Sequence, residues 1–436
     1  MNNESVLEFE EEEICLIIED YLEKNIKKCS SPEFYEKMGD EIIDFFLQNY
    51  YLPDVDVSDD SKEKEEITEM VWDSIDEILL FYNIPKRQNV NDDDFLFVGE
   101  KEKQKNMIIL RELDKINNLQ PKQRTSEWYQ YRYNRFSASS IWKLLSTPSQ
   151  YNSMILEKCK PYIANANDGL LTNYNNPRNW GIKYERVSMM IYEDKHPTTK
   201  VKTDYGCIPH PLYSFIGASP DGINISPECP EKYGRMVEVK NIYNRDITGI
   251  PLEEYWIQMQ IQMETCRLNT CDFLETRFKE YLGEKEFYED STQEYKGVIL
   301  FFLAKNSGSE HFFEYMPLYV NLEKRHVDKW ICEIQEKYLE TNILYEKIYW
   351  YLDEYSCVIV ERNIPWFESV LPIIEEAWNI VISERKMGYK HREPVSRNTK
   401  DKGHSITITK KLDKFCVVKI DSNIIKPVSI EDVPIV

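Results

Sequence analysis

Two acidic residues and a lysine, Asp221, Glu238 and Lys240, are the residues of this sequence best suited to do chemistry. Asp221 lies in the turn S-P-D-G, where proline fixes the backbone and glycine lets it approach other groups closely. Residues 236–242 alternate as expected of a half-buried strand. Since side chains two apart share one face, Glu238 and Lys240 should point the same way, and the valines beside them should point to the core.

If this turn packs beside the strand, two carboxylates and an ammonium group converge on one spot. Hard oxygen ligands of this kind select Mg²⁺ or Mn²⁺. A lysine beside them can hold or deprotonate a water, or stabilise charge on a phosphate. This is the chemistry of metal-assisted phosphodiester hydrolysis. The alternative is that E-x-K is the solvated polar face of an antiparallel sheet, as it is in many proteins.

Arg132 and Ser139 could bind a phosphate. Arg132 is expected at the end of one short helix that Ser126 caps, and Ser139 near the start of the next, with Ser137 or Ser139 as its N-cap. An arginine beside a hydroxyl and free N–H groups at a helix start makes a phosphate cradle. The alternative is an ordinary helix cap beside a surface arginine.

Two further helices carry polar residues next to apolar stripes. Glu185 follows Pro177 on a helix before the expected sheet. As a semi-buried glutamate it is either a metal ligand, direct or through water, or a half-solvated or salt-bridged residue. On the helix 253–266, Tyr255, Gln258 and Gln262 share one side beside the apolar stripe. They either orient groups in a site or form a polar flank.

Both helices and strands are expected after residue 100, and we expect an α/β (α+β) fold. Helices are predicted at 6–28, 33–50, 67–83, 100–118, 322–350 and 366–387, and strands at 200–208, 212–217, 271–279, 296–304, 312–320 and 355–361. Polar runs at 54–66 and 92–105 are expected to be connections, and a hairpin is a candidate at 405–409 and 415–420.

The net charge of −22 is concentrated in one part of the chain. Residues 1–100 hold 29 acidic and 8 basic side chains, so the remainder is nearly neutral and can still present a basic groove to DNA. We predict an acidic helical region at 1–100, a core with C-terminal helices at 101–385 and a basic tail at 386–436. The acidic region is either a solvated helical domain, a partner-binding module or an acidic DNA mimic.

The cysteines and histidines exclude several classes of protein. The ten cysteines and six histidines are dispersed, with no C-x-x-C or H-x-x-x-H pair, which argues against a disulfide framework, a zinc ribbon and a histidine metal site. No stretch reads as a signal peptide or spans a bilayer. We therefore expect a protein of a reducing compartment that is not secreted and has no membrane partner.

Several motifs in a fixed order resemble the YqaJ-type viral recombinase family, which includes the lambda-exonuclease-like enzymes of the PD-(D/E)XK nucleases. They are W-x-x-x-R with S-A-S, W-G-x-x-Y-E, A-S-P-D-G, V-E-V-K and Y-x-x-Q-x-Q. The resemblance implies a restriction-endonuclease-like core with a central mixed β-sheet flanked by helices. It also implies a Mg²⁺-dependent 5′→3′ exonuclease acting on double-stranded DNA, with two metal ions.

The same resemblance implies a role for each site residue. Asp221, Glu238 and the backbone carbonyl of Val239 would bind the metal, and Glu185 would serve a second metal or its waters. Lys240 would activate or position the attacking water. Orientation of these groups would fall to Gln258 and Tyr255, and the terminal 5′-phosphate to Arg132 and Ser139.

The acidic first hundred residues and the extension beyond about 340 depart from the phage pattern and look like the enlarged forms of large cytoplasmic DNA viruses. We expect a nuclease of viral DNA recombination, repair or replication, in the host cytoplasm or viral factory. A structure-specific endonuclease on DNA or RNA, and a non-catalytic DNA-binding scaffold, are the alternatives. The expected partners are double-stranded DNA ends, further copies of the chain, and a single-strand annealing or replication protein bound by the acidic region.

Overall fold

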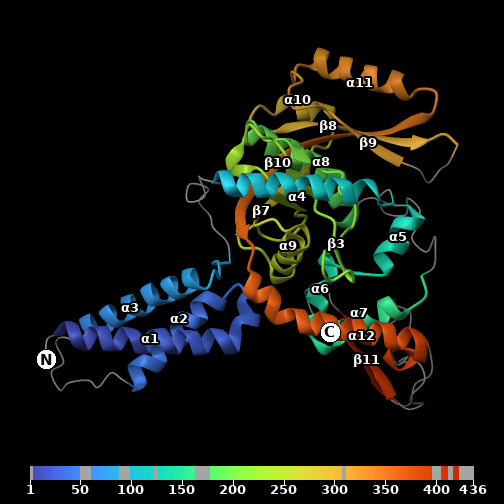
Figure 1. The fold of residues 1–436 in the computed structure, drawn as a ribbon. Coiled ribbons are helices and arrows are strands. Elements are labelled where there is room, and N and C mark those ends of the chain that lie inside the picture. Colours follow the sequence, from blue (N-terminus) through green and yellow to red (C-terminus); the bar gives the residue numbers. More distant parts are fainter. Residues whose placement is uncertain are drawn as a thin grey trace. The chain divides into compact units, whose positions relative to one another are not determined.

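A computed structural model describes residues 3–49, 60–87, 99–121, 125–162, 177–306, 311–394, 404–410 and 416–421. The chain divides into a large unit, Met1–Gly388, and a small unit, Tyr389–Val436. Figure 1 shows the elements of both, coloured along the sequence. In the described part of the chain, no helix combines the length and the apolar character needed to cross a membrane.

The large unit is built on a mixed sheet of seven described strands in the order β2-β5-β6-β7-β10-β8-β9. Strands β6 and β7 run parallel, and the other described pairs of this sheet are antiparallel. The strands are β2 (Val201–Lys202), β5 (Gly222–Asn224), β6 (Met236–Asn241), β7 (Thr270–Glu280), β8 (Lys296–Ala304), β9 (His311–Tyr315) and β10 (Asn342–Glu361). The predicted fold class, a central mixed sheet flanked by helices, is confirmed.

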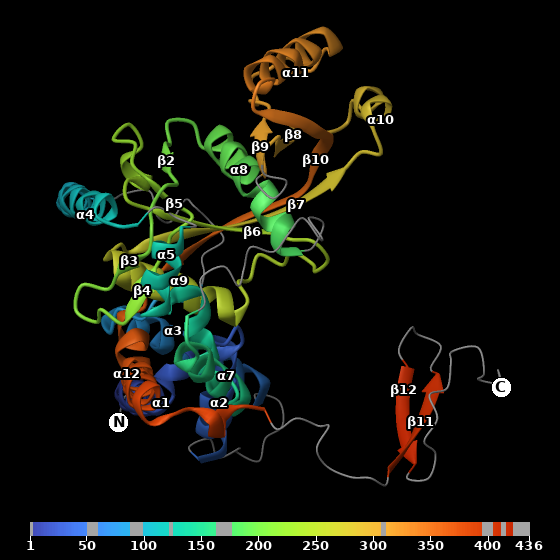
Figure 2. The same ribbon diagram turned by 90° about the vertical axis from the view of Figure 1, so that its right-hand side faces the viewer.

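Helices α8 (Pro177–Lys195) and α9 (Glu253–Cys266) cover opposite faces of this sheet. Val237 and Val239 on β6 pack in one apolar cluster with Met189 and Tyr192 of α8. The alternate residue Glu238 receives hydrogen bonds from α9. Because alternate side chains of a strand point to opposite faces, the two helices lie on either side of β6, as Figure 2 shows.

The strand β6 is therefore buried on both faces, and the prediction of a half-buried strand is wrong. Val237, Glu238 and Val239 are all buried, and Lys240 is half-buried. A strand in the interior of a sheet with a helix on each side has no solvated face. The apolar stripe of α8, which includes Trp180 and Tyr184, is buried against the sheet.

Residues 322–350 were predicted as one long helix, and this prediction is wrong. The helix α11 covers only Lys324–Tyr338, and β10 then begins at Asn342. The start of β10 is rich in isoleucine and tyrosine, which favour strands, and β10 pairs with both β7 and β8. These long-range pairings are what make the segment a strand.

A small sheet and further helices complete the large unit. The sheet has the order β1-β4-β3, formed by β1 (Phe136–Ser137), β3 (Ile208–Pro209) and β4 (Ile216–Ala218). The further helices of the large unit include α4 (Glu100–Asn118), α5 (Ser126–Tyr133), α6 (Ala138–Ile141), α7 (Pro148–Cys159), α10 (Glu284–Glu289) and α12 (Ile364–Met387). Since α4 begins at Glu100, the end of the expected 92–105 connection is helical, while its residues up to 98 lie outside the described part.

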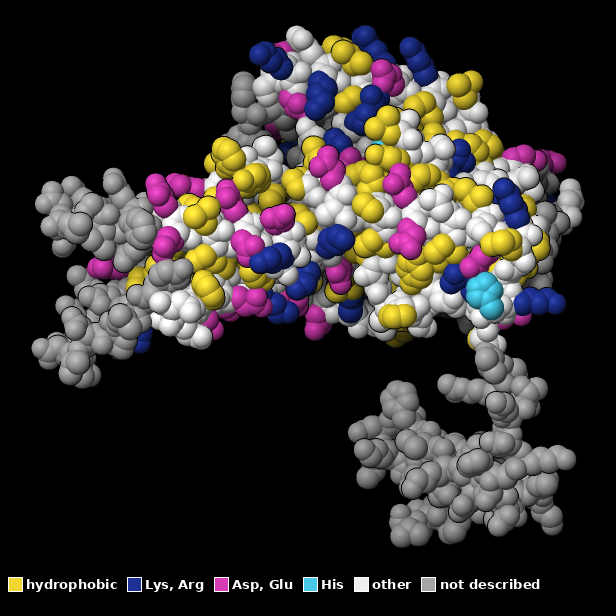
Figure 3. All heavy atoms as spheres, turned by 60° about the horizontal axis from the view of Figure 1, so that its bottom comes forward, with side chains coloured by type: hydrophobic (Ala, Val, Ile, Leu, Met, Phe, Trp, Pro, Cys, Tyr) yellow, Lys and Arg dark blue, Asp and Glu magenta, His cyan; other side chains and the backbone are white. Residues whose placement is uncertain are grey.

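The N-terminal region consists of α1 (Asn3–Asn25), the short 3-10 helix η1 (Ile26–Ser30), α2 (Phe34–Asn49) and α3 (Asp60–Phe81). Met38 and Ile42 of α2 are buried, and on α1 the buried stripe runs through Ile14 and Ile18, whereas Leu16 is exposed. The start of α3 at Asp60 falls within the expected loop 54–66, of which residues 54–59 lie outside the described part. Figure 3 shows acidic and hydrophobic side chains side by side over these helices, at the left.

The N-terminal helices contact the region around α9 directly. The Arg87 side chain donates a hydrogen bond to the carbonyl of Pro251 at 2.6 Å, and the Trp256 indole donates to the carbonyl of Arg87 at 3.1 Å. The Ser30 hydroxyl donates to Glu253 at 2.7 Å. These contacts place the acidic helices against the start of the helix that lines the candidate site.

The small unit contains two antiparallel strands, β11 (His404–Lys410) and β12 (Cys416–Asp421), and the single turn η5 (Lys390–Arg392). The strands lie where the sequence predicted a hairpin. The residues between them, including Phe415, lie outside the described part of the chain.

Candidate active site

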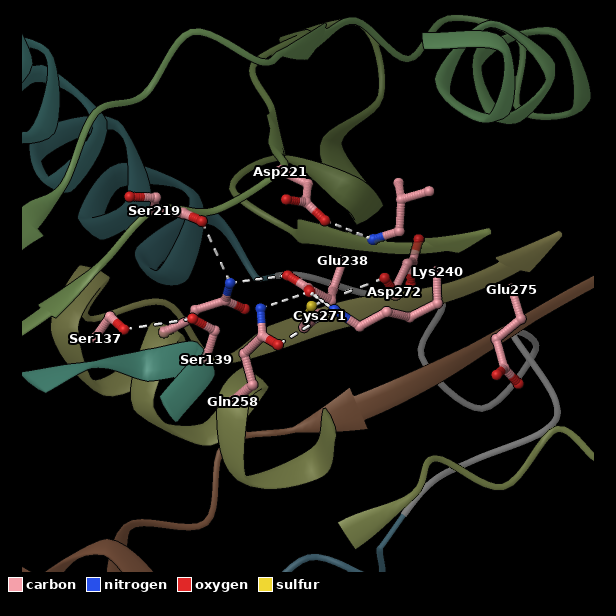
Figure 4. A network of polar contacts seen from close by, with 12 residues as sticks. Ser137, Ser139, Ser219, Asp221, Glu238, Lys240, Gln258, Cys271, Asp272 and Glu275 are labelled. Atoms are coloured by element: carbon pink, nitrogen blue, oxygen red, sulfur yellow. Dashed lines mark hydrogen bonds and ion pairs between the residues drawn. The ribbon is translucent and has the colours of Figure 1, made fainter. Parts of the chain in front are cut away.

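The structure brings all the predicted site residues to one cavity of about 480 Å³. These residues are Arg132, Ser139, Glu185, Asp221, Glu238, Val239, Lys240, Tyr255 and Gln258. They come from five helices and strands and from the turn between β4 and β5. The close-up in Figure 4 shows Asp221, Glu238, Lys240 and Gln258 gathered around one spot.

Asp221 is placed by the turn that leads from the small sheet into the large one. Directly after it, Gly222 pairs with Val237 of β6. A Cβ atom at position 222 would lie 2.3 Å from the Val201 side chain, so the close approach of Val201 to this turn requires glycine. The Asp221 carboxylate accepts a hydrogen bond from the backbone N–H of Val239 at 2.9 Å and thereby caps β6 where its pairing with β5 ends.

Glu238 is held by three donors although its side chain is only 1% exposed. One carboxylate oxygen accepts hydrogen bonds from the Lys240 ammonium and from the Gln258 amide, the latter at 2.6 Å. The other oxygen accepts from the Gln262 amide at 2.8 Å. The Lys240 ammonium also donates to the Gln258 carbonyl oxygen at 3.2 Å. Buried charge is tolerated where it is hydrogen-bonded and paired in this way.

The negative charge in this cavity exceeds the positive charge next to it. Burial, followed by the charges of Glu238 and Glu185, raises the pKa of Asp221 well above its ordinary value. Burial alone would lower the pKa of Lys240, but the charges of Glu238 and Asp221 outweigh it and raise that pKa. Lys240 also lies 4.7 Å from the centre of the Tyr255 ring, a cation–π contact. A bound cation would relieve the repulsion between the carboxylates.

The donor set fits a hard divalent cation in type. Asp221 and Glu238 provide carboxylate oxygens, and the carbonyl of Val239 is expected on the side of its N–H, which faces Asp221. Among the described residues, no group of three or more His, Cys, Asp and Glu side chains could hold a metal ion. A site here would therefore combine two side chains with backbone oxygen and water.

Glu185 lies at the rim of the cavity. It was predicted to be semi-buried, and this prediction is wrong, since its side chain is exposed. The reason is that α8 turns its Trp180–Ile191 stripe to the sheet, which leaves position 185 on the solvent side. Its charge still reaches Asp221, whose pKa it helps to raise.

Arg132 and Ser139 lie at another part of the cavity wall. The Arg132 guanidinium donates to the Ser219 hydroxyl at 3.2 Å and stacks over Trp128 at 4.5 Å from the ring centre. Ser139 is exposed, and its hydroxyl lies 3.4 Å from that of Ser137. An arginine fixed by a ring and a hydroxyl is held in place to bind an anion.

The predicted N-caps differ from the observed ones. Thr125, not Ser126, caps α5 by accepting from the N–H of Trp128. The N-cap of α6 is Ser137, one of the two predicted, but its side chain makes no capping hydrogen bond. When two hydroxyl residues are adjacent, residue type alone does not show which of them caps the helix.

Gln262, which was expected either to orient groups in a site or to form a polar flank, also lines the cavity, and so do Ser219 and Trp128, to which no role was assigned from the sequence. For Gln262 the signal was present, since it follows Gln258 by one helical turn. In the motif Y-x-x-Q-x-Q the second glutamine is Gln260, and it points away from the site: its amide donates to the carbonyl of Glu361 and accepts from the N–H of Asn363.

This chain is similar to one family model, to a viral protein and to two solved structures. Residues 127–269 match the model of the YqaJ-like viral recombinase domain. A protein of Acanthamoeba polyphaga mimivirus is 26% identical over 316 residues, which cover 63% of this chain and 55% of that protein. The match therefore spans about half the length of this curated relative.

Two solved structures of the alkaline exonuclease LHK-Exo from Laribacter hongkongensis are also similar, one of them in complex with dAMP. Each is 17% identical, with TM-scores of 0.35 and 0.33, and the similarity covers 60% and 61% of this chain and 95% of theirs.

Every predicted site residue lies inside the segment that matches the family model. The order of motifs, the mixed sheet and the match thus agree on one identification. Residues 127–269 of the chain are thus similar to the YqaJ-like viral recombinase domain.

Proposed function

We propose that the chain is a Mg²⁺- or Mn²⁺-dependent deoxyribonuclease that digests double-stranded DNA from 5′ ends in viral recombination, repair or replication. The observation that supports it most is the convergence of Asp221, Glu238 and Lys240 in a cavity that also holds Arg132. A pair of carboxylates and an ammonium suit phosphodiester hydrolysis, and a stacked arginine suits a terminal phosphate.

In this proposal each residue has one task. Asp221, Glu238 and the Val239 carbonyl would hold a divalent cation, with Glu185 toward a second ion or its waters; bound metal would polarise the phosphate and lower the pKa of a water. Lys240 would position the attacking water or neutralise charge on the phosphate. Gln258 and Tyr255 would keep Lys240 and Glu238 in place, consistent with their contacts.

At the phosphate end, Arg132 and Ser139 would bind the 5′-phosphate of the DNA end. This would set the distance from the end to the bond that is cut, because both groups lie on the wall of the cavity that holds the carboxylates. Arg132→Ala should then weaken the preference for 5′-phosphorylated over 5′-hydroxyl ends. An equal loss on both kinds of end would instead indicate a structural role.

The test is digestion of linear duplex DNA labelled at either end, beside closed circular DNA, with Mg²⁺ present or chelated. The full chain is compared with Asp221→Asn, and with Asp246→Asn as a matched change at an exposed aspartate outside the cavity. Metal-dependent release of nucleotides from 5′ ends, with circles spared and only Asp221→Asn inactive, is the expected result.

Other outcomes of the same experiment lead to other functions. Cut or nicked circles would replace the exonuclease with an endonuclease at the same site. Binding of duplex DNA without cleavage by the full chain would replace it with a DNA-binding scaffold. Equal activity of Asp221→Asn and the full chain would contradict the site itself.

A further inference from the structure

Gln262 bridges the two segments that carry the carboxylates. It is 1% exposed on α9. Its amide nitrogen lies 2.8 Å from a carboxylate oxygen of Glu238 on β6 and 3.5 Å from the carbonyl oxygen of Ser219, two residues before Asp221. The two N–H groups of one amide can serve both acceptors.

The same bridge continues to the phosphate side of the cavity. The Ser219 hydroxyl accepts the hydrogen bond of Arg132 at 3.2 Å. A chain of contacts therefore runs from Arg132 through Ser219 and Gln262 to Glu238. Lys240 and Gln258 hold only the other oxygen of Glu238, so within the described residues Gln262 is its link to the Ser219 turn.

Gln262 is poorly suited to a purely structural role. Its carbonyl oxygen is buried and has no hydrogen-bond partner within the described part of the chain. An unpaired buried acceptor lowers stability, and an apolar side chain of similar size would avoid that cost. Gln260, two residues earlier on the same helix, is the opposite case, because both ends of its amide are hydrogen-bonded.

We propose that Gln262 is a positioning residue that couples the binding of the 5′-phosphate by Arg132 to the orientation of Glu238, the proposed metal-binding carboxylate. The inference rests on the function proposed above and adds a regulation of that site. A 5′-phosphate bound by Arg132 would favour the orientation of Glu238 that binds the cation. The amide itself touches neither phosphate nor metal.

The test compares Gln262→Met with Gln260→Met, which make the same change on the same helix. The first readout is the Mg²⁺ concentration that gives half of the maximal rise in unfolding temperature. Gln262→Met should raise this concentration about tenfold, the lower end of what outer-shell partners of a metal contribute. It should also lower the unfolding temperature of the metal-free protein, because it removes the donor to one buried oxygen of Glu238. Gln260→Met should lower the unfolding temperature and leave the Mg²⁺ concentration unchanged.

The second readout is the rate ratio between 5′-phosphorylated and 5′-hydroxyl duplexes at saturating Mg²⁺. Gln262→Met should reduce this ratio several-fold, and adding Arg132→Ala should reduce it no further than Arg132→Ala alone, since both changes break one chain of contacts. If Gln262→Met fails to fold, Gln262→Asn replaces it. Its shorter amide should also fail to reach both acceptors.

An unchanged Mg²⁺ midpoint in the Gln262 variant would overturn the inference, and so would fully additive losses in the double variant. A full chain that cleaves no DNA would refute the proposed function instead, and the Mg²⁺ midpoint would then decide the inference alone. If Mg²⁺ does not shift the unfolding temperature of the full chain, the inference fails whatever the cleavage result.

Discussion

Two buried carboxylates on neighbouring strands, Glu238 on β6 and Asp272 on β7, have nearly the same exposure and opposite surroundings. Both are 1% exposed. Asp272 pairs in register with Val237, so it lies on the α8 face of the sheet, while Glu238 lies on the α9 face. Asp272 accepts from the Tyr192 hydroxyl at 2.6 Å and from Arg235 at 3.3 Å, with Lys232 at 3.6 Å.

Asp272 thus has two cations and a hydroxyl, and it is not among the residues that line the cavity around Glu238. Around Glu238 the carboxylates of Asp221 and Glu185 add to the negative charge. These three carboxylates share one cavity with two cations, Lys240 and Arg132. Burial of a carboxylate therefore does not mark a site. Uncompensated charge next to a hollow does, because it can accept a cation.

The largest effect is expected from a change at Asp221, which lines the cavity around Glu238. Asp221→Asn should reduce DNA cleavage by more than about a hundredfold, the loss that even outer-shell partners of a metal can reach, and should not lower the unfolding temperature. Cleavage assays and thermal unfolding of one preparation check this. An Asp221→Asn protein that is inactive because it is unfolded would remove the contrast with Asp272.

The second largest effect is expected from removal of the negative charge of Asp272, which lies beside two cations. Asp272→Asn should lower the free energy of unfolding by about 3–5 kcal/mol, because it removes a carboxylate that is paired with the buried side chains of Arg235 and Lys232. Denaturant titration measures the change. The folded fraction should still cleave DNA, and a folded but inactive variant would show that Asp272 belongs to the site.

A smaller effect is expected from the hydroxyl next to Asp272. Tyr192→Phe should cost about 1.5–3 kcal/mol, the contribution of a hydrogen bond to a charged group. Cleavage per folded molecule should stay unchanged. The same denaturant titration applies, with Tyr129→Phe as a control, because that tyrosine is only half-buried.

The smallest expected effect is the pH dependence of stability that Asp221 produces in the metal-free protein. Because the pKa of Asp221 is raised on folding, its contribution to stability is fully present below the unfolded value of about 4. It is lost as the pH rises through the folded pKa. Relative to Asp221→Asn, the metal-free protein should lose stability with a slope of at most about 1.4 kcal/mol per pH unit.

Unfolding in chelator over a pH series measures this slope, and addition of Mg²⁺ should remove it. A difference between the two proteins that grows as the pH falls would have the wrong sign. It would show that the ionised form of Asp221 is the one that stabilises the fold.

The candidate site could be predicted from the sequence where neighbouring residues determine it. Side chains two apart on a strand share a face, so Glu238 and Lys240 had to lie together once 236–242 was a strand. A tight S-P-D-G turn shortly before that strand placed Asp221 within reach. On α9, helical spacing put Tyr255 and Gln258 on one side.

Long-range packing decided what the sequence could not show. Residues 342–350 carry side chains compatible with either element, and pairing with β7 and β8 made them a strand. The choice between Gln260 and Gln262 depended on which side of α9 faces Glu238 and which faces the segment at Asn363. Glu185 became exposed because α8 buries the stripe beside it.

The sequence by itself determined which residues are chemically able to form the site, because residue type and local spacing fix which atoms can lie together over one turn or one strand. Only the tertiary structure decided which carboxylate is balanced and which is not. Glu238 and Asp272 are alike in type and burial, and the difference between them comes from Arg235, Lys232 and Asp221. Coulomb interactions depend on distance through space, which the order of residues along a chain does not specify.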